Sequence, residues 1–484
     1  MAEATKTPAE VRRDEAMDKV TGIDGWLTRS EAEALYGLAV RSTGHIVEIG
    51  SWKGRSTAAL GLGSMAGKGH SVYAVDPFYQ IADARKTSLG NLAPEVERTG
   101  PELLRRNLDA AGVNGAVKIV PYDSASGSQH VPDGIAVLFI DGDHSFQAVC
   151  RDLDVWLPKV ADGGFVMMHD CTTTDPGVVE ALDNRVLSRP QEFRLLDRID
   201  SAIVFQKRRS IPRTVQLMCP GHTFSWGTTE AVAHASIGLH RVDLDNNGNG
   251  WDDFNAMWAR ALNRAEAGEI SHAVMLHSDC KPQAGWLDIL VDECEDKKAD
   301  LVSVACAMKD LRGVMNCGLG TPSNRWGSFR RLTVRELVQK LPATFGCEDL
   351  KRLLDWRGAD PKVHADAVLL HNTGCFVADL RPRMVDNVNA NPFYKTDAQG
   401  RLTAWFDFPT DIVRDKDTGK WVNRRESEDW FFSRQLAQLG ARTFITKKVR
   451  LRHQGIADFT NDTTWGEYEY DKDSAPQWEP KKEQ

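Results

Sequence analysis

Residues His45–Ser56 read HIVEIGSWKGRS, and this stretch organises the first half of the chain. A short apolar run with Glu48 near its end breaks at Gly50 into a small, polar turn, and the helix-forming sequence TAALGLGSMA follows directly. Glycines after a buried strand allow a tight turn and a close backbone approach to a ligand, and the next helix offers free N–H groups. The stretch therefore predicts a nucleotide-type pocket at the carboxyl end of a parallel strand. Taken alone, such a pattern more often marks an ordinary glycine-rich turn.

Length and composition are those of an ordinary globular protein with more than one domain. The chain has 484 residues, of which 42% are hydrophobic and 26% charged, and this length exceeds one typical core. A net charge of −8 gives no general attraction to nucleic acid or to anionic membranes. The nine cysteines are scattered without a C-x-x-C pair, which favours reduced thiols. Because no apolar run has the length of a membrane span or of a signal sequence, we expect a cytoplasmic protein without a membrane span.

Apolar strands alternate with amphipathic helices between residues 22 and 206. We predict strands at residues 46–49, 71–75, 117–120, 137–140, 164–168, 193–196 and 202–205. A helix before the first strand begins with Thr28 and carries Glu31 three residues later, which is a capping box. Strands separated by helices predict an α/β, Rossmann-like, doubly wound parallel sheet. Residues 1–21 are expected to form a charged leader.

Polar residues follow the strands of this first domain at the points where they end. They are Asp76 after the second strand, Asp123 and Ser124 after the third, Asp141, Asp143 and His144 after the fourth, and His169 and Asp170 after the fifth. Each residue alone is more typical of a cap or a turn, but carboxylates at successive strand ends along one sheet edge favour a binding site. Asp76 is placed to accept hydrogen bonds from both ribose hydroxyls of a nucleotide.

These motifs together resemble class I S-adenosylmethionine-dependent methyltransferases over residues 22–206. The similarity is greatest to the macrocin O-methyltransferase type and more distant to catechol O-methyltransferase. EIGSWKGRS resembles the glycine-rich first motif, Asp76 the ribose-binding acid and Asp123-Ser124 the contact on the adenine side. By this resemblance S-adenosylmethionine is the cofactor, and the residues that bind it are Glu48, Gly50, Ser51, Lys53, Gly54, Ser56, Asp76, Asp123 and Ser124.

The same resemblance implies a divalent metal site made of Asp141, His169 and Asp170. In catechol-type enzymes the ion, usually magnesium, holds the acceptor hydroxyl and lowers its pKa, and a base removes the proton before in-line attack on the methyl group. The base there is a lysine, and His144 stands at the matching position here. His169 stands where those enzymes have aspartate, and a histidine ligand favours manganese, iron or zinc. The alternative is that His169 supports Asp170 without touching the metal.

A short charged segment with a proline, QKRRSIPR, separates this domain from a second α/β domain. We place the linker at residues 207–212, the second domain at 213–458 and a polar tail at 459–484. Asp279 follows an apolar strand at residues 273–276, where a carboxylate can reach a metal-bound diphosphate, although a single aspartate there is more often a turn residue. Glu428 and Asp429 begin a helix, and KKVRLRHQG ends a strand with His453.

Together with the turn Asn372–Cys375, these stretches resemble inverting, family-two glycosyltransferases of the GT-A fold over roughly residues 212–458. The resemblance implies a nucleotide sugar as co-substrate, with Ser278 and Asp279 at its diphosphate, and Asp429 as the base that deprotonates the acceptor hydroxyl. His453 would complete a magnesium or manganese site with Asp279. His277 stands where the first aspartate of the usual acidic motif is expected. Glu428 and Asp429 alone are also typical of a charge pair at a helix start.

The sequence therefore predicts a bifunctional enzyme for O-methyl and glycosyl transfer, acting on a glycan or a glycosylated acceptor. One alternative is modification of nucleic acid or of a virion protein. The net negative charge speaks against nucleic acid, and the arginine-rich stretches 324–335 and 447–452 keep it open without making it the favoured partner. Another is that one domain serves only as a sugar- or cofactor-binding module. The residues Arg325, Trp326, Phe329, Arg330 and Arg331 fit either a loop that grips sugar or phosphate or an ordinary surface loop.

Overall fold

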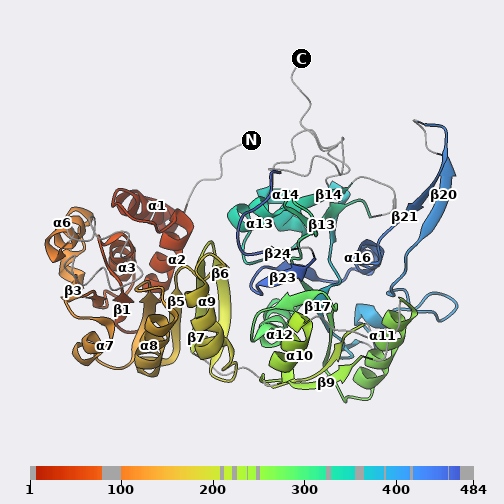
Figure 1. Cartoon of the computed structure of the whole chain (residues 1–484), viewed down its shortest axis with the longest axis horizontal. Helices are drawn as coiled ribbons and strands as arrows, with labels where there is room; N and C mark the ends of the chain where they lie inside the picture. The colour runs from red at the N-terminus through yellow and green to blue at the C-terminus, as the bar shows by residue number, and fades with distance from the viewer. Residues whose placement is uncertain are drawn as a thin grey trace. The chain divides into compact units, whose positions relative to one another are not determined.

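The chain folds into two compact units in the computed structural model, Met1–Arg209 and Ser210–Gln484 (Figure 1). The division falls inside the segment 207–212 that the sequence predicts as a linker. The structure describes residues 7–78, 100–207, 212–220, 226–236, 238–246, 251–322, 329–354, 365–385, 388–414, 418–455 and 457–468. Two residues of the predicted sugar- or phosphate-gripping loop, Arg325 and Trp326, lie outside these ranges.

A seven-stranded sheet in the order β3-β2-β1-β4-β5-β7-β6 forms the centre of the first unit. Its strands are β1 (Ile46–Ile49), β2 (Val72–Val75), β3 (Val117–Val120), β4 (Ile135–Ile140), β5 (Val160–Met168), β6 (Phe193–Ile199) and β7 (Ala202–Lys207). All seven predicted strands are confirmed. The first five run parallel, whereas β7 is antiparallel to both β5 and β6. We predicted a parallel sheet, and the β6–β7 edge departs from that prediction. Only Asp200 and Ser201 join β6 to β7, and so short a link makes an antiparallel hairpin.

The register of the parallel strands brings their carboxyl ends to one edge of the sheet. Ile49 at the end of β1 is aligned with Val75 of β2 and with Ile140 of β4. Ile140 is in turn aligned with Met168 at the end of β5. The polar residues that follow these four strands therefore leave the sheet side by side, as the strand-end pattern in the sequence predicts.

Helices cover both faces of this sheet. On one side lie α1 (Pro8–Thr21), α2 (Arg29–Val40), α3 (Arg55–Ala66) and α6 (Pro101–Ala111), and on the other lie α8 (Phe146–Trp156) and α9 (Pro176–Leu182) (Figure 1). Helix α2 begins with the predicted capping box, because the Thr28 side chain accepts from the Glu31 N–H and the Glu31 carboxylate accepts from the Thr28 N–H.

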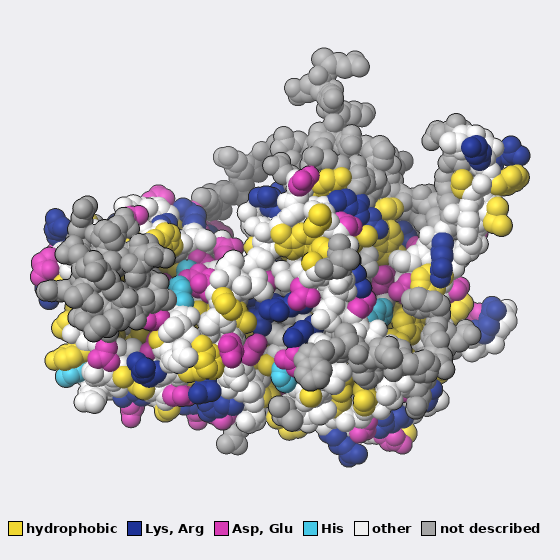
Figure 2. Space-filling view, viewed as in Figure 1, with side chains coloured by type: hydrophobic (Ala, Val, Ile, Leu, Met, Phe, Trp, Pro, Cys, Tyr) yellow, Lys and Arg dark blue, Asp and Glu magenta, His cyan; other side chains and the backbone are white. Residues whose placement is uncertain are grey.

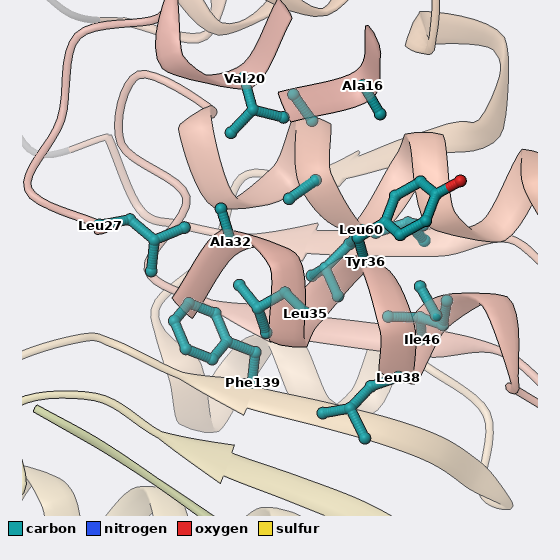
Figure 3. Packing of buried hydrophobic residues seen from close by; sticks show 14 of the residues in the cluster. Ala16, Val20, Leu27, Ala32, Leu35, Tyr36, Leu38, Ile46, Leu60 and Phe139 are labelled. Carbon is teal, nitrogen blue, oxygen red and sulfur yellow. The ribbon is translucent and has the colours of Figure 1, made fainter. Parts of the chain in front are cut away.

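The core between α1–α3 and the sheet is apolar and closed to solvent. Leu35 and Leu38 of α2 and Leu60 of α3 pack near Ile46 and Phe139 of the sheet, and all five side chains are at most 3% exposed (Figure 3). Helix α1 contributes the buried side chains of Ala16, Met17 and Val20 to the same cluster. Residues 8–21 are therefore part of the folded unit, and the prediction that residues 1–21 are only a charged leader is wrong for them.

The second unit is built on a mixed seven-stranded sheet in the order β15-β22-β12-β17-β10-β8-β9. The strands are β8 (Thr214–Met218), β9 (Arg241–Asp245), β10 (His272–Leu276), β12 (Leu301–Val304), β15 (Thr344–Phe345), β17 (Cys375–Asp379) and β22 (Thr443–Thr446). Strand β17 runs antiparallel to both of its neighbours, β10 and β12. The unit is α/β as predicted, and its GT-A-like assignment stays a prediction.

An aromatic core packs α11 (Trp251–Glu266) and α16 (Glu428–Gln438) against this sheet. The ring of Trp258 lies 5.2–6.4 Å from four phenylalanine rings in edge-on arrangements, a geometry that adds stability beyond area burial. These rings belong to Phe376, Phe393, Phe406 and Phe432. Two further helices, α10 (Trp226–Ser236) and α12 (Trp286–Lys297), contact each other in the same unit.

Smaller sheets and helices complete the second unit. They are β11 (Cys280–Pro282) with β23 (Leu451–Gln454) and β24 (Asp458–Thr460), β13 (Val314–Gly320) with β14 (Phe329–Thr333) and β16 (Val368–Leu370), the pairs β18 (Met384–Val385) with β19 (Val388–Asn389) and β20 (Thr410–Arg414) with β21 (Trp421–Arg425), and the helices α13 (Val334–Lys340) and α14 (Cys347–Leu353). Asn461 is buried and bonds the backbone of Leu451 and Ala305. The folded unit therefore extends past residue 458, where the sequence predicts a polar tail.

Among the described residues, no helix combines the length and the apolar character needed to cross a membrane.

The first unit has a core of its own, and so has the second, so we expect each to fold separately. The cluster beneath α1–α3 is made only of residues from the first unit, and the aromatic cluster around Trp258 only of residues from the second. Chains ending at Arg209 and beginning at Ser210 should each give a cooperative thermal transition by circular dichroism. Aggregation of both pieces under conditions in which the whole chain stays folded would contradict this expectation.

Candidate functional site

The carboxyl ends of the parallel strands in the first unit border a cavity of about 490 Å³. All predicted site residues of this unit except Glu48 line it. They are Gly50, Ser51, Lys53, Gly54, Ser56, Asp76, Asp123, Ser124, Asp141, His144, His169 and Asp170. The volume is within the range of small-molecule sites, roughly 300–1,000 Å³. The sheet edge thus brings together residues that are up to 120 positions apart in the sequence, as the strand-end pattern predicts.

The glycine turn after β1 is required by the fold itself. Gly50 has φ +87°, and a Cβ atom there would lie 2.0 Å from the carbonyl oxygen of Asp141. Gly54 has φ +89°, and its Cβ atom would lie 2.4 Å from the Leu104 side chain. A larger residue at either position would have to displace neighbouring atoms and adopt a strained backbone. The glycines are therefore explained by close packing within the protein, before any ligand is considered.

Asp76 fixes the shape of this turn. Its carboxylate accepts hydrogen bonds from the backbone N–H groups of Ser51 at 3.0 Å, Trp52 at 2.9 Å and Phe78 at 2.8 Å. Burial raises the pKa of Asp76, although these three donors oppose the shift. A carboxylate has about four acceptor positions, so the backbone leaves at most one of them for a ligand. The predicted contact with both ribose hydroxyls stays a prediction, and what Asp76 holds in this structure is the loop.

Glu48 is the predicted cofactor residue that lies outside the cavity. Its side chain is fully buried beneath α3 and accepts a hydrogen bond from the Thr57 hydroxyl. Burial raises the pKa of Glu48 to about 7, and hydrogen bonds from Ser56 and Thr57 only partly oppose this. Glu48 therefore joins β1 to the start of α3, and its predicted role in cofactor binding stays a prediction.

Asp123 and Ser124 line the cavity and also stabilise the local fold. The Asp123 carboxylate caps the short helix α7 (Ser124–Gly127) by accepting from the Ser126 N–H at 3.1 Å. The Ser124 hydroxyl accepts from the indole N–H of Trp156 at 2.8 Å. Their predicted role on the adenine side of the cofactor stays a prediction.

The predicted metal ligands and the predicted base form one charged cluster. Asp141, His169 and Asp170 each offer a ligand atom, and these atoms lie within 4.8 Å of one another. His144 Nε2 lies 3.6 Å from Asp141 Oδ1 and 3.4 Å from Asp170 Oδ2. The hydrogen bond with Asp141 raises the pKa of His144 to about 8, although burial opposes it. The two histidines therefore lie where positive charge balances these carboxylates.

His169 is held from both sides. Its Nδ1 atom lies 3.1 Å from Asp170 Oδ2 and 3.5 Å from Asp141 Oδ1, and its Nε2 atom lies 3.1 Å from Glu31 Oε2. A histidine that ligates a metal usually gives the proton of its other nitrogen to a carboxylate or carbonyl, and Glu31 is placed to receive that proton. The donor set of two carboxylates and one imidazole therefore fits a divalent cation. The same contacts also fit the alternative, in which a protonated His169 pairs with Asp170.

The predicted donor site of the second unit brings Asp279 and His453 together. Strand β11 pairs with β23 so that Cys280 is aligned with His453, and His453 Nε2 lies 3.4 Å from Asp279 Oδ2. Lys309 forms an ion pair with the same carboxylate. Although burial opposes the shift, His453 and Lys309 hold the pKa of Asp279 well below its usual range. The backbone carbonyl of Ser278 accepts a hydrogen bond from the Thr228 hydroxyl at 2.7 Å.

Asp429, the predicted base of the second unit, is tied to its neighbours. Its carboxylate accepts from the Thr373 backbone N–H at 2.6 Å, from the Thr373 hydroxyl and from the Asn316 amide at 2.9 Å. Burial and then the charge of Asp429 raise the pKa of the adjacent Glu428 to about 8. Both side chains are buried at the start of α16. Asp429 therefore does more than balance a helix dipole, because it links α16 to the turn that precedes β17.

A cavity of about 850 Å³ lies beside α16 and does not include Asp429 among its lining residues. Trp258, Trp405, Phe431, Arg434 and Gln435 are among the residues that line it. Asp429 instead faces Thr373 and Asn316, as its hydrogen bonds require. An acceptor in this cavity would therefore not meet the predicted base.

Three of the basic residues in the stretch 447–452 are buried, which weakens the argument from this stretch for modification of nucleic acid. Lys447, Lys448 and Arg450 are at most 7% exposed. The Lys447 ammonium donates to the carbonyls of Leu337 and Val338, and Lys448 pairs with Glu293. On the face drawn in Figure 2, basic side chains are interspersed with acidic ones over the described residues. Within 324–335, Arg330 is buried against Glu336, while Arg331 stacks on Phe329 and Trp430, so these residues serve the fold.

Part of the first unit is similar to a known protein family. Residues 47–171 match a family model described as a methyltransferase domain. The first unit contains a methyltransferase domain. An uncharacterised protein of Acanthamoeba polyphaga mimivirus is 29% identical over 126 residues, which are 26% of this chain and 50% of that protein. The alignment therefore spans only half the length of this relative.

Solved structures resemble the chain at low sequence identity. The O-methyltransferase NovP is 18% identical with a TM-score of 0.35, and the match covers 42% of this chain and 100% of NovP. The O-methyltransferase TomG from Streptomyces achromogenes, solved in complex with S-adenosylmethionine, is 13% identical with a TM-score of 0.30, over 43% of this chain and 92% of TomG.

Sequence reasoning missed part of the cluster in the methyltransferase domain. Glu31 was visible only as the third helical residue of a capping box, yet it also bonds His169 and both the backbone N–H and the hydroxyl of Ser201. Asp175, whose Oδ1 lies 3.4 Å from His144 Nδ1, follows no strand directly. The charge of Glu31 at a buried helix position was the available signal, because a buried carboxylate needs partners.

Replacement of Glu48 by glutamine should make the stability of the methyltransferase domain less dependent on pH. The pKa of Glu48 is about 7 in the folded state, above its ordinary value of 4.5, so the unfolded chain ionises first and the wild type loses stability as the pH rises from about 4.5 to about 7. We expect Glu48→Gln to gain on the order of 3 kcal/mol relative to wild type between pH 4 and pH 8. Urea denaturation of the first unit at both pH values measures this gain, and parallel behaviour of the two proteins would contradict it.

Proposed function

We propose that the first unit transfers a methyl group from S-adenosylmethionine to an oxygen of its acceptor. The observation that carries this proposal is the cavity of about 490 Å³ at the ends of β1, β2, β4 and β5, inside a domain that matches a methyltransferase family model. The site joins a glycine turn, a helix start and a cluster of carboxylates and histidines. This combination suits a cationic methyl donor and an acceptor hydroxyl that must lose a proton.

The residues around the cavity suit the parts of S-adenosylmethionine. Helix α3 starts at the glycine turn without a side-chain cap, so its first N–H groups can receive the carboxylate of the amino-acid part. Lys53 and Arg55 beside them line the cavity and add positive charge. Asp123 and Ser124 follow the end of β3 and suit the adenosine part.

We further propose that Asp141, His169 and Asp170 hold a divalent cation. When bound, such a cation orients the acceptor hydroxyl and lowers its pKa. Glu31 keeps the His169 ring in place and receives the proton of Nε2, so Nδ1 can act as a ligand. His144 is the base that takes the acceptor proton, and it can do so only in its neutral form.

Binding of S-adenosylmethionine should depend on Asp76 through the loop that it holds. Asp76→Ala leaves the N–H groups of Ser51, Trp52 and Phe78 without their acceptor, and we expect the dissociation constant to rise at least tenfold, about 1.4 kcal/mol. Calorimetry with S-adenosylmethionine measures this change. Asp133→Ala, which removes an exposed partner of Lys159, is the control and should bind like wild type. Wild-type affinity in a folded Asp76→Ala variant would contradict the proposed site.

For the second unit we propose transfer of a sugar from a nucleotide sugar. The observation that favours it is the meeting of Asp279, His453 and Lys309 just beyond β10, with Asp429 at the start of α16. A carboxylate and an imidazole suit magnesium or manganese at a diphosphate, and the Lys309 ammonium suits a phosphate oxygen. Burial lowers the pKa of His277, although the charges of Asp429 and Asp279 oppose the shift. The simplest hypothesis is that both proposed activities act on the same acceptor, a glycan or a glycosylated product.

Asp429→Asn should abolish sugar transfer and leave the fold almost unchanged. Asparagine keeps an oxygen for the Thr373 N–H, and the Asn316 amide can turn its own oxygen towards the new NH₂ group. We expect transfer to fall at least a hundredfold, because a positioned base typically contributes 10² to 10⁴. The measurement is product formation, by mass spectrometry, from a panel of nucleotide sugars and glycan acceptors.

Two outcomes of this experiment bear on the alternatives. Wild-type transfer by Asp429→Asn would rule out its role as base and leave a structural link between α16 and Thr373. Binding of a nucleotide sugar by the wild type without any transfer would make the second unit a binding module, as one alternative reading of the sequence holds.

A further inference from the structure

We propose that Cys280, Cys306 and His453 form a thiolate metal site of zinc type in the second unit. One ligand atom from each of the three residues lies within 4.8 Å of the others. In tetrahedral zinc sites with metal–sulfur distances of about 2.3 Å, ligand atoms lie roughly 3.3–3.8 Å apart. A movement of about one ångström therefore closes the three side chains around an ion. The sequence predicts Asp279 and His453 as ligands and does not predict the two thiols.

Three separate segments supply these ligands, and the sheets hold each of them. Cys280 begins β11, and its register partner in β23 is His453. Cys306 follows the end of β12 by two residues. Cys280 and Cys306 are at most 1% exposed, whereas the His453 side chain is 18% exposed. The site is therefore pre-formed by the backbone, is lined by sulfur inside and is reached from the side of His453.

The tautomer of His453 is set for metal binding. Its Nδ1 atom lies 2.7 Å from the carbonyl oxygen of Ala307, which can only accept a hydrogen bond, so Nδ1 carries the proton. Nε2 faces Asp279 and would give up its proton on binding a metal, and a bond from the other ring nitrogen to a carbonyl is the usual support of a metal-bound histidine. Ala307 directly follows Cys306, so the residue that orients the imidazole is next to a ligand.

Asp279 lies beside this group of three and would have to move further than they do to become a fourth ligand. Its Oδ2 atom lies 3.4 Å from His453 Nε2, and its Oδ1 atom lies 3.9 Å from Cys280 Sγ. Two thiolates, an imidazole and a carboxylate make a four-ligand set for zinc, while magnesium prefers oxygen ligands alone. The site uses Asp279 and His453 of the proposed sugar-transfer centre, so it rests on that proposal and deepens it by replacing magnesium or manganese there with a zinc-type ion. The two thiols identify the resident metal as a soft or borderline ion.

Cobalt(II) substitution tests the site in the full-length protein, since thiolate ligands give cobalt a near-ultraviolet charge-transfer absorption that oxygen and nitrogen ligands do not. The probe is cobalt chloride added to metal-stripped protein, with the thiols kept reduced by a phosphine. We expect the absorption in wild type and its loss in Cys280→Ser and in Cys306→Ser. Cys317→Ser, at a buried cysteine of the same unit outside the cluster, is the matched control and should keep the absorption. The carboxylate and histidine cluster of the first unit contains no thiol ligand, so it does not give this signal.

Each outcome decides the proposal. No charge-transfer absorption in folded wild type, or its persistence in both serine variants, would overturn it. If the serine variants do not fold, His453→Asn decides, because it leaves both thiols in place: at least tenfold weaker cobalt binding supports the site, and unchanged binding overturns it. Because the readout is bound metal, a thiolate site without any sugar transfer would refute the proposed function of the second unit and leave this inference standing.

Discussion

The buried carboxylate of Glu31 connects the fold of the first unit to its candidate site. One oxygen caps α2 at Thr28 and meets His169, and the other accepts from the backbone and side chain of Ser201 in the β6–β7 turn. Burial raises the pKa of Glu31, but its contacts with His169 and these donors outweigh that effect and lower it. Loss of one partner of such a buried pair typically costs about 3–5 kcal/mol, because the other charge is left unpaired. Glu31 thus connects the start of α2, the β6–β7 turn and the charged cluster through hydrogen bonds and an ion pair.

Charge balance then explains the arrangement of the cluster around the cavity. Asp141 and Asp170 lie at adjacent strand ends, and two carboxylates this close repel each other unless cations lie between them. His144 and His169 fill that role, and although burial opposes it, they hold the pKa of Asp141 below its usual range. A divalent cation would supply the same compensation with a higher charge. The residues that balance the charge of this cluster are therefore the residues that suit a metal.

Several charged residues of the second unit are buried and take part in its packing. Lys447, Lys448 and Arg450 lie inside the unit, and carbonyls or carboxylates satisfy the two lysines. Asp429 joins α16 to Thr373, and Asp279 joins Lys309 to His453. These pairs bring the ends of β10, β12 and β23 together, which is where the thiols of Cys280 and Cys306 meet the imidazole of His453. The candidate centre lies where these chain segments meet, because Asp279 contacts both Lys309 and His453 there.

The sequence by itself determined the local features of this protein. Apolar periodicity and strand-end residues were enough for the seven strands of the first unit, for the capping box at Thr28 and for the glycine turn at Gly50, because each depends on neighbours in the chain. Only the tertiary structure decided that Glu31 contacts His169, that Glu48 lies outside the cavity and that Lys447, Lys448 and Arg450 are buried. It alone brought Cys280, Cys306 and His453 together. Such contacts depend on strand order and register, which place residues more than a hundred positions apart within bonding distance, and no local pattern encodes them.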